Sequence, residues 1–157
     1  MGIEKLDILN WDISILAQSL RLSEEDTKLY FTDGRRVSFI LERRICNEIL
    51  QGRLATSEGA GFDVFDKDGK KWEVRSVTAG GIYFCPSYMV GSGRRFEEQG
   101  FFDKLAEIEG YIVSDVTKFP HIPVWKVSAE TVRNWYVTNT LGAGTKISRA
   151  KALSLLS

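Results

Sequence analysis

The sequence is poor in the residues that most often build structural zinc sites. It has only two cysteines, Cys46 and Cys85, which lie in unrelated contexts, and a single histidine, His121. A structural zinc ion is normally bound by four Cys or His side chains at short, regular spacings. We therefore expect no such site, and the scarcity of cysteine favours a reducing, cytoplasmic setting.

Long hydrophobic runs are also missing. Apolar residues make up 43% of the 157 residues, but no run approaches the roughly 20 consecutive apolar residues of a membrane span. The first residues do not follow the pattern of a secretory signal. We expect a protein without a membrane segment, most simply one domain of 157 residues that buries a substantial core.

Neither sign of charge is in excess. The chain has 21 basic and 21 acidic residues, so its formal net charge is zero. A protein that only coats nucleic acid is usually basic overall, which argues against that class. A nuclease stays possible, because metal-binding carboxylates offset basic contact residues in the sum and only the local distribution of charge matters to DNA.

The stretch from Asp63 to Arg75 has the pattern of a β-hairpin. The apolar run Phe62 to Phe65 leads into Asp66-Lys67-Asp68-Gly69, an Asp-Gly signal that joins antiparallel strands. A second strand is predicted over 70–77. Its side chains alternate between two faces, with Lys71, Glu73 and Arg75 on one and Trp72, Val74 and Ser76 on the other.

This hairpin brings together the residue types that phosphodiester hydrolysis needs. The reaction requires a metal ion that polarises the phosphate, carboxylates that hold the metal, and a cation that stabilises the charge at phosphorus. Asp63 and Glu73 supply two carboxylates, the carbonyl of Val74 can add a third oxygen ligand, and Arg75 supplies the cation. The spacing alone is a weak signal, because surface hairpins often carry acids and an arginine.

A helix is predicted over 36–50 and carries two further acids. At about 100° per residue, Glu48 projects inside the apolar arc of this helix and Glu42 lies at its margin. A carboxylate that faces the core needs a salt bridge or a metal. Glu48 is therefore a further candidate metal ligand; alternatively, its stem packs while its carboxylate reaches solvent.

Hydrophobic periodicity predicts the remaining elements. Helices are expected over 3–20, 97–108 and 128–136. Another helix is expected to begin after Ser23, which would cap it, with Asp26 at the capping-box position. Strands are expected over 82–85, 111–116 and 124–127. The helix over 3–20 is apolar on more than one side, which suits either a core helix or a dimerisation element. The order predicts an α/β fold with a central mixed β-sheet flanked by helices. We expect residues 1–52 to form a helical support or dimerisation region and residues 53–140 to form the catalytic core.

The hairpin resembles the PD-(D/E)xK nuclease superfamily, and within it the type II restriction endonucleases of the PvuII kind. Asp63 and Glu73 stand ten positions apart, and the basic Arg75 follows two residues later. The resemblance covers about 58–136. It implies a restriction-endonuclease-like fold, Mg²⁺ as cofactor with Mn²⁺ as a substitute, and sequence-specific cleavage of double-stranded DNA by a symmetric homodimer. Asp63, Glu73 and Arg75 would be the catalytic residues, with the metal held by the two acids and Val74.

Two departures from the family pattern qualify this resemblance. Arg75 stands where the family has a lysine, and arginine stays protonated where lysine can lose its proton or orient a water. Phe62 stands where the family has a proline. The alternative is a catalytically inactive DNA- or protein-binding domain on the same scaffold.

Residues that contact DNA are expected after the second strand and in the Gly-rich segment 87–96. Arginine, serine and threonine side chains reach base edges or phosphates, and small residues allow the backbone to approach DNA. The candidates are Ser76, Thr78, Ser87, Tyr88, Ser92, Arg94 and Arg95. The alternative for 87–96 is a surface loop whose arginines are merely solvated.

Overall fold

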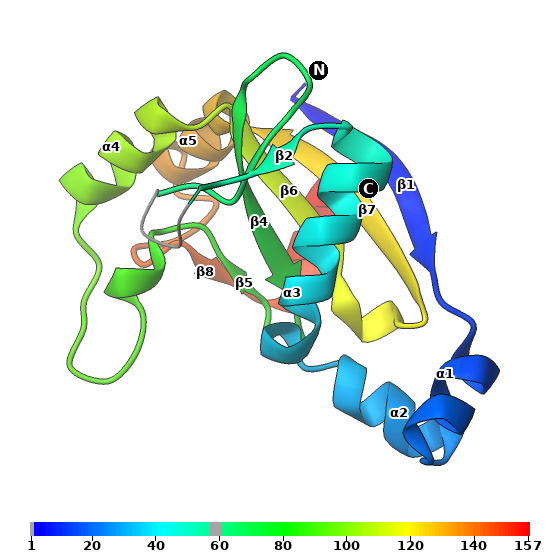
Figure 1. Cartoon of the computed structure of the whole chain (residues 1–157). Coiled ribbons are helices and arrows are strands. Elements are labelled where there is room, and N and C mark those ends of the chain that lie inside the picture. Colours follow the sequence, from blue (N-terminus) through cyan, green and yellow to red (C-terminus); the bar gives the residue numbers. More distant parts are fainter. Residues whose placement is uncertain (1, 57–60) are drawn as a thin grey trace.

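The computed structural model describes residues 2–56 and 61–157, and its centre is a curled six-stranded mixed sheet (Figure 1). The strand order is β1-β7-β6-β4-β3-β2. The strands are β1 (Ile3–Asn10), β2 (Arg53–Leu54), β3 (Val64–Phe65), β4 (Lys71–Val77), β6 (Gly110–Asp115) and β7 (His121–Ser128). Only β4 and β6 run parallel to each other, and the other neighbours are antiparallel. The predicted α/β class and the central mixed sheet are confirmed.

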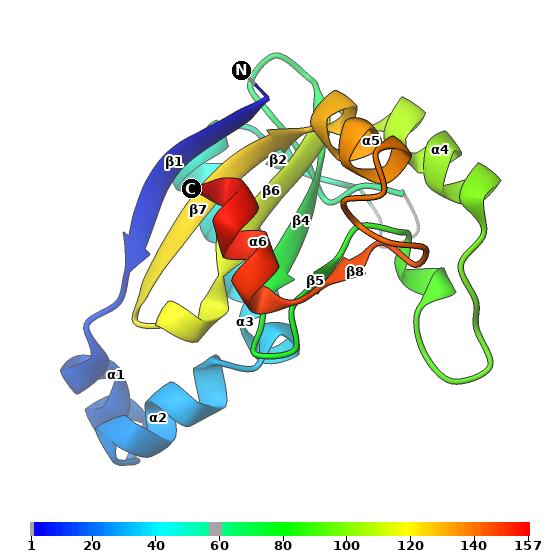
Figure 2. The ribbon, with the colours of Figure 1, turned by 180° about the vertical axis from the view of Figure 1, so that it is seen from behind.

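Helices cover both faces of the sheet (Figures 1 and 2). One face carries α3 (Gly34–Arg44), which continues as the π-helical turn η1 (Ile45–Leu50). The other face carries α4 (Glu98–Glu107), α5 (Ala129–Val137) and α6 (Arg149–Leu156). Shorter elements are α1 (Ile13–Leu20), α2 (Glu24–Phe31), η3 (Ser87–Met89), η4 (Val116–Lys118), and the separate pair β5 (Ile82–Tyr83) and β8 (Lys146–Ile147).

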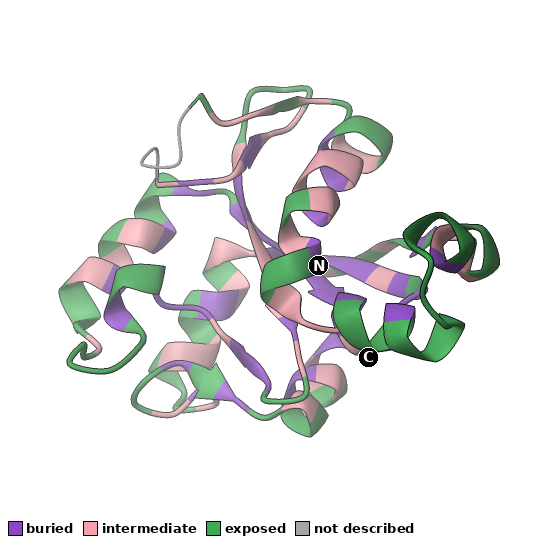
Figure 3. Cartoon of the chain, turned by 60° about the horizontal axis from the view of Figure 1, so that its bottom comes forward, coloured by how far each residue is buried: buried purple, intermediate pink, exposed green. Residues whose placement is uncertain are grey.

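The core therefore has two layers, one on each side of β6. All six residues of β6 are buried, as expected for a central strand with both faces covered. Figure 3 shows buried residues along the strands in the middle of the molecule and exposed residues on the outer sides of the helices. Tyr111 and Val113 pack with α4, α5 and α6, whereas Ile112 packs with α3 residues such as Val37 and Leu41. No helix within 2–56 and 61–157 combines the length and the apolar character that a membrane span requires.

The predicted helix over 3–20 is wrong in its first half. Residues 3–10 form β1, which pairs with β7 along its length, and only Ile13–Leu20 is helical. The register of β1 shifts between Lys5 and Asp7, and this irregularity breaks the two-residue alternation that marks a strand in the sequence. Asp12 separates the two elements, because its side chain caps α1 by accepting from the Ile15 N–H at 3.1 Å.

Most of the other predicted elements are confirmed. Ser23 and Ser128 cap α2 and α5 as expected, the 36–50 helix is present with its start at Gly34, and the hairpin turns at Asp66–Gly69. The strand predicted over 82–85 is shorter, ending at Tyr83. The loop predicted over 51–61 includes 57–60, which lie outside the described residues.

Candidate functional site

The β3–β4 hairpin places Asp63 beside the strand that carries Glu73. Asp66 fixes the turn by accepting from the N–H groups of Asp68 at 2.9 Å and Lys70 at 3.0 Å, and Gly69 takes a positive φ of 80°. The Asp63 N–H donates to the Trp72 carbonyl at 3.0 Å, just before the paired residues of β3. The turn chemistry therefore sets the register that brings the two acids together.

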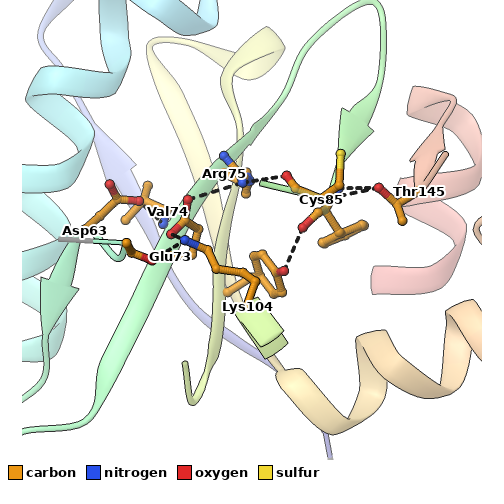
Figure 4. A network of polar contacts seen from close by, with 10 residues as sticks. Asp63, Glu73, Val74, Arg75, Cys85, Lys104 and Thr145 are labelled. Carbon is orange, nitrogen blue, oxygen red and sulfur yellow. Dashed lines mark hydrogen bonds and ion pairs between the residues drawn. The ribbon is translucent and has the colours of Figure 1, made fainter. Parts of the chain in front are cut away.

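Asp63 and Glu73 form a closely spaced pair of carboxylates (Figure 4). Asp63 Oδ2 accepts from the Val74 N–H at 2.7 Å, which holds its carboxylate against β4. Burial and the negative charge of Glu73 raise the pKa of Asp63 from 3.8 to about 6. The N–H and C=O of one strand residue point to the same side, so the Val74 carbonyl also faces the side of Asp63.

Two cations balance the buried charge of Glu73, which is only 7% exposed. Arg75 Nη2 lies 3.2 Å from Oε1, and Lys104 Nζ lies 2.9 Å from Oε2. Lys104 also donates to the carbonyl of Gly61. The result is a buried cluster in which two acids from the hairpin meet one cation from β4 and one from α4.

Lys104 is a site residue that reasoning from the sequence missed. It lies on α4, whose buried residues are Phe101 and Leu105, and it falls about 60° from Phe101 around the helix. A lysine at the edge of an apolar stripe is the signal that the sequence offered. The sequence did not indicate which acid this lysine would meet.

Arg75 is held by groups other than Glu73. Its Nη2 donates to the Cys85 carbonyl at 2.9 Å, and its guanidinium lies over the Tyr83 ring at 4.8 Å. Thr145 positions this carbonyl, because its Oγ1 accepts from the Cys85 N–H at 2.9 Å (Figure 4). Arg75 is thus a fixed fork whose orientation depends on a segment distant in sequence.

The acid pair offers two carboxylates of the kind that an open site for a hard divalent cation uses. Mg²⁺ is usually held by one or two protein carboxylates together with water and phosphate oxygens, rather than by a cage of protein ligands. Glu73 Oε2 is buried and accepts no hydrogen bond from a described residue, although it faces Lys104. Among the described residues, no group of three or more His, Cys, Asp or Glu side chains could hold a metal. A two-carboxylate site is therefore what these residues fit.

Known proteins offer no relative from which a function could be transferred. No protein-family model, curated protein or solved structure matches the chain. Function is therefore inferred from the chemistry of the site.

Two hollows meet at the acid pair, and both are lined by Asp63, Glu73 and Ser87. The α4 hollow has a volume of about 450 Å³ and lies toward α4. The α3 hollow has a volume of about 740 Å³ and lies between the start of α3 and β4. Each is large enough for part of an extended ligand.

The predicted DNA-contacting residues divide between these hollows and the surface. Ser76 and Thr78 line the α3 hollow, Tyr88 lines the α4 hollow, and Ser87 lines both. The remaining three line neither of the two hollows and are exposed: Ser92, Arg94 and Arg95.

The prediction that Glu48 projects into the apolar arc is wrong, and the alternative, a carboxylate that reaches solvent, is confirmed. Residues Ile45–Leu50 form a π-helical turn, so the rotation of 100° per residue does not hold there. Glu48 is exposed and forms an ion pair with Arg44, at 2.5 Å and 2.9 Å, and this hydrogen bonding lowers the pKa of Glu48. Arg44 stacks on Trp11, on the side of β1. Glu42 instead lines the α3 hollow together with Asp63.

Proposed function

We propose that this chain is a Mg²⁺-dependent endonuclease that hydrolyses double-stranded DNA, with Asp63 and Glu73 as its metal-binding acids. The observation that carries the proposal is the paired, largely buried carboxylates of Asp63 and Glu73 beside two cations, open to hollows on two sides. Burying like charges together is unfavourable unless a cation offsets them, and the raised pKa of Asp63 reports that cost. Such clusters in a cleft are typical of functional sites.

Each residue has a distinct part in the proposed reaction. When bound, Mg²⁺ would polarise the phosphate and lower the pKa of a water. Asp63 and Glu73 hold the metal, with the Val74 carbonyl as a further oxygen ligand. Lys104 and Arg75 stabilise the negative charge that develops on the phosphate, since both cations already lie within 3.2 Å of Glu73.

Lys104 can supply the ammonium group that the family motif places at position 75 and that this chain lacks there. The resemblance to PD-(D/E)xK nucleases leads one to expect a lysine at position 75, where this chain has Arg75. In our proposal α4 supplies the ammonium group instead, because Lys104 Nζ is 2.9 Å from Glu73 Oε2. The two cations are not equivalent: Lys104 is a compact charge, whereas Arg75 is a planar fork held by Cys85 and Tyr83.

The family resemblance also supports a restriction-endonuclease-like fold, sequence-specific cutting and a symmetric homodimer. A two-fold axis would match two scissile phosphates on antiparallel strands. Exposed apolar side chains surround a hollow of about 500 Å³ near α1, α2 and α3, which gives such a dimer a surface to bury. The exposed side chains available to such a dimer are Leu20 and Leu22, at and just after the end of α1, because Arg36 and Arg43 lie over the rings of Tyr30 and Phe39.

The rival proposal is a non-catalytic DNA- or protein-binding domain. It is favoured by one observation: Arg75 and Lys104 already neutralise Glu73, so the cluster is balanced by protein groups alone. In that case the ion pairs would serve stability only.

The test is cleavage of plasmid DNA by the purified protein in Mg²⁺. We expect discrete fragments from the wild type and none from Asp63→Ala or Glu73→Ala, with circular dichroism showing that each variant is folded. Glu130→Ala on α5 is the control, because Glu130 is exposed and lines neither hollow. Cutting that survives in both acid variants contradicts the assignment.

A further inference from the structure

The α3 hollow continues into a third hollow along the same helix. The third hollow has a volume of about 370 Å³ and lies beside the later turns of α3. The two share three lining residues: Ser38, Glu42 and Asp63. They therefore form one groove, here called the α3 groove, which runs between α3 and the hairpin with Asp63 at its middle. At its start, α3 approaches β4 closely, because a Cβ on Gly34 would lie 3.0 Å from Thr78 Cγ2.

Arginines stand at both ends of the α3 groove. Arg35 and Arg36 line the end at the start of α3, and Arg43 lines the other end. With a rise of 1.5 Å per residue, Arg36 and Arg43 lie roughly 10 Å apart along the helix axis. Within residues 2–56 and 61–157, no ion pair engages any of the three. Their charges are thus not offset by a described carboxylate at ion-pair distance.

Aromatic rings hold two of these guanidinium groups at the surface. Arg36 lies over Tyr30 at 4.6 Å and Arg43 lies over Phe39 at 3.4 Å. Stacking fixes the plane of a guanidinium while leaving N–H donors at its edge for an anion. This arrangement reduces the side-chain entropy lost when a phosphate binds.

The opposite side of the acid pair has a different charge. The α4 hollow is lined by Asp103 and Glu107 in addition to Asp63 and Glu73, with Lys104 as its only lining cation among the described residues. The α3 groove is lined by four arginines (Arg35, Arg36, Arg43 and Arg75) and four acids (Asp33, Glu42, Asp63 and Glu73), so its formal charge is balanced, whereas the α4 hollow has three more acids than cations. A nucleic-acid backbone is therefore repelled more strongly by the α4 hollow than by the α3 groove. The charges therefore favour the α3 side for the backbone.

We infer that the α3 groove binds the phosphate backbone of one DNA strand, with Arg35 and Arg36 on one side of the scissile phosphate and Arg43 on the other. This inference rests on the proposed nuclease function and names the surface that holds its substrate. Roughly 10 Å corresponds to about three nucleotides at 3.4 Å per nucleotide along one strand, which leaves the central phosphate beside Asp63 and Glu73. Zero net charge is compatible with this, because the attraction is local.

The test measures binding without cleavage. A 30-base-pair fluorescent duplex is titrated in EDTA at several salt concentrations with the wild type, Arg35→Gln/Arg43→Gln and Arg35→Lys/Arg43→Lys. The control is Arg133→Gln/Lys151→Gln, which removes the same charge from exposed residues of α5 and α6. Circular dichroism checks that every variant is folded.

We expect the glutamine pair in the groove to weaken binding about tenfold or more and to reduce the slope of log K against log salt by about 1.8, since each phosphate contact contributes about 0.9. The lysine pair should keep most of the slope, and the control should bind like the wild type. Equal losses in groove and control variants, an unchanged slope, or no binding by the wild type overturn the inference. Cleavage in Mg²⁺ is measured separately. If DNA binds through the α3 groove but is not cut, the nuclease proposal is contradicted and the groove inference stands. If DNA is cut equally well by the glutamine variant, the groove inference is contradicted and the nuclease proposal stands.

Discussion

Lys104 Nζ lies 2.9 Å from Glu73 Oε2, which joins the middle of α4 to β4, the second strand of the hairpin. Each side chain in this pair is only 10% exposed. The contact links a residue outside the hairpin to one of its two paired acids. It is also the contact that most changes the chemistry read from the sequence, because it adds a lysine to a site that otherwise offers only Arg75.

Replacing Lys104 with methionine should reduce both stability and cleavage. A buried ion pair that loses one partner leaves an uncompensated charge, so we expect the free energy of unfolding to fall by about 3 kcal/mol. Cleavage should fall by about 100-fold, a typical loss for one group that stabilises developing charge. Urea denaturation and single-turnover cleavage measure the two effects.

Lys70→Met is the matched control for Lys104→Met. Lys70 pairs with Glu109 at 3.5 Å, with both side chains about half exposed, so its loss should cost less than about 1 kcal/mol and leave cleavage unchanged. The double variant Glu73→Gln/Lys104→Met should regain part of the stability lost by Lys104→Met. Additive effects in this cycle would mean that the two residues do not interact as described.

Replacing Arg75 with lysine distinguishes its contribution to stability from its proposed contribution to cleavage. Lysine cannot donate to Cys85, pair with Glu73 and stack on Tyr83 with one fixed fork, so we expect a loss of roughly 1–2 kcal/mol in the free energy of unfolding. Cleavage should be preserved or raised, because lysine stands at this position in the nuclease family that the hairpin resembles. A loss as large as that of Arg75→Ala would mean that the guanidinium fork itself is needed.

Asp63 should make the metal-free protein less stable as the pH rises. Its pKa is raised from 3.8 to about 6, so between these values the folded chain holds a proton that the unfolded chain has released. The contribution of Asp63 to the free energy of unfolding therefore falls as the pH rises through this window. Above about pH 7 the carboxyl is charged in both states, and the loss of stability from Asp63 has reached its full size.

Asp63→Asn should remove this dependence. At pH 8 in EDTA the variant should be more stable than the wild type by roughly 1–3 kcal/mol, from about 1.4 kcal/mol per pKa unit, and at pH 3.5 the two should nearly coincide. Urea denaturation across this range measures the difference, with exposed Asp103→Asn as control. A variant that is no more stable than the wild type at pH 8 contradicts the raised pKa.

The two loop arginines test whether segment 87–96 reads DNA. If Arg94 and Arg95 contact bases, Arg94→Gln/Arg95→Gln should relax the sequence preference of cleavage by about 1–3 kcal/mol per lost contact, as measured on a library of randomised duplexes. A variant that loses affinity equally for all sequences would assign the two arginines to phosphates. An unchanged profile would leave them as solvated surface residues.

Local chemistry explains which elements the sequence predicted correctly. The Asp66–Gly69 turn and the caps at Ser23 and Ser128 depend on residues a few positions apart, so their signals are complete in the sequence. The pairing of Asp63 with Glu73 follows from the same turn. This is why the two acids could be placed together before the fold was known.

Tertiary contacts explain what the sequence did not predict. β1 was mistaken for helix because its register shift hides the alternation and its pairing with β7 is long-range. The predicted direction of the Glu48 side chain was wrong because a π-helical turn begins at Ile45, and this departure from α-helix geometry has no distinctive sequence signal. Lys104 depends on how α4 packs against β4.

Calorimetric titration with Mn²⁺ or Mg²⁺ tests the central claim most directly. The wild type should show saturable binding that is lost in both Asp63→Asn and Glu73→Gln and retained in Glu130→Gln. Absence of binding by the wild type, or equal binding by the acid variants, would contradict a metal site at these two carboxylates and favour the non-catalytic alternative.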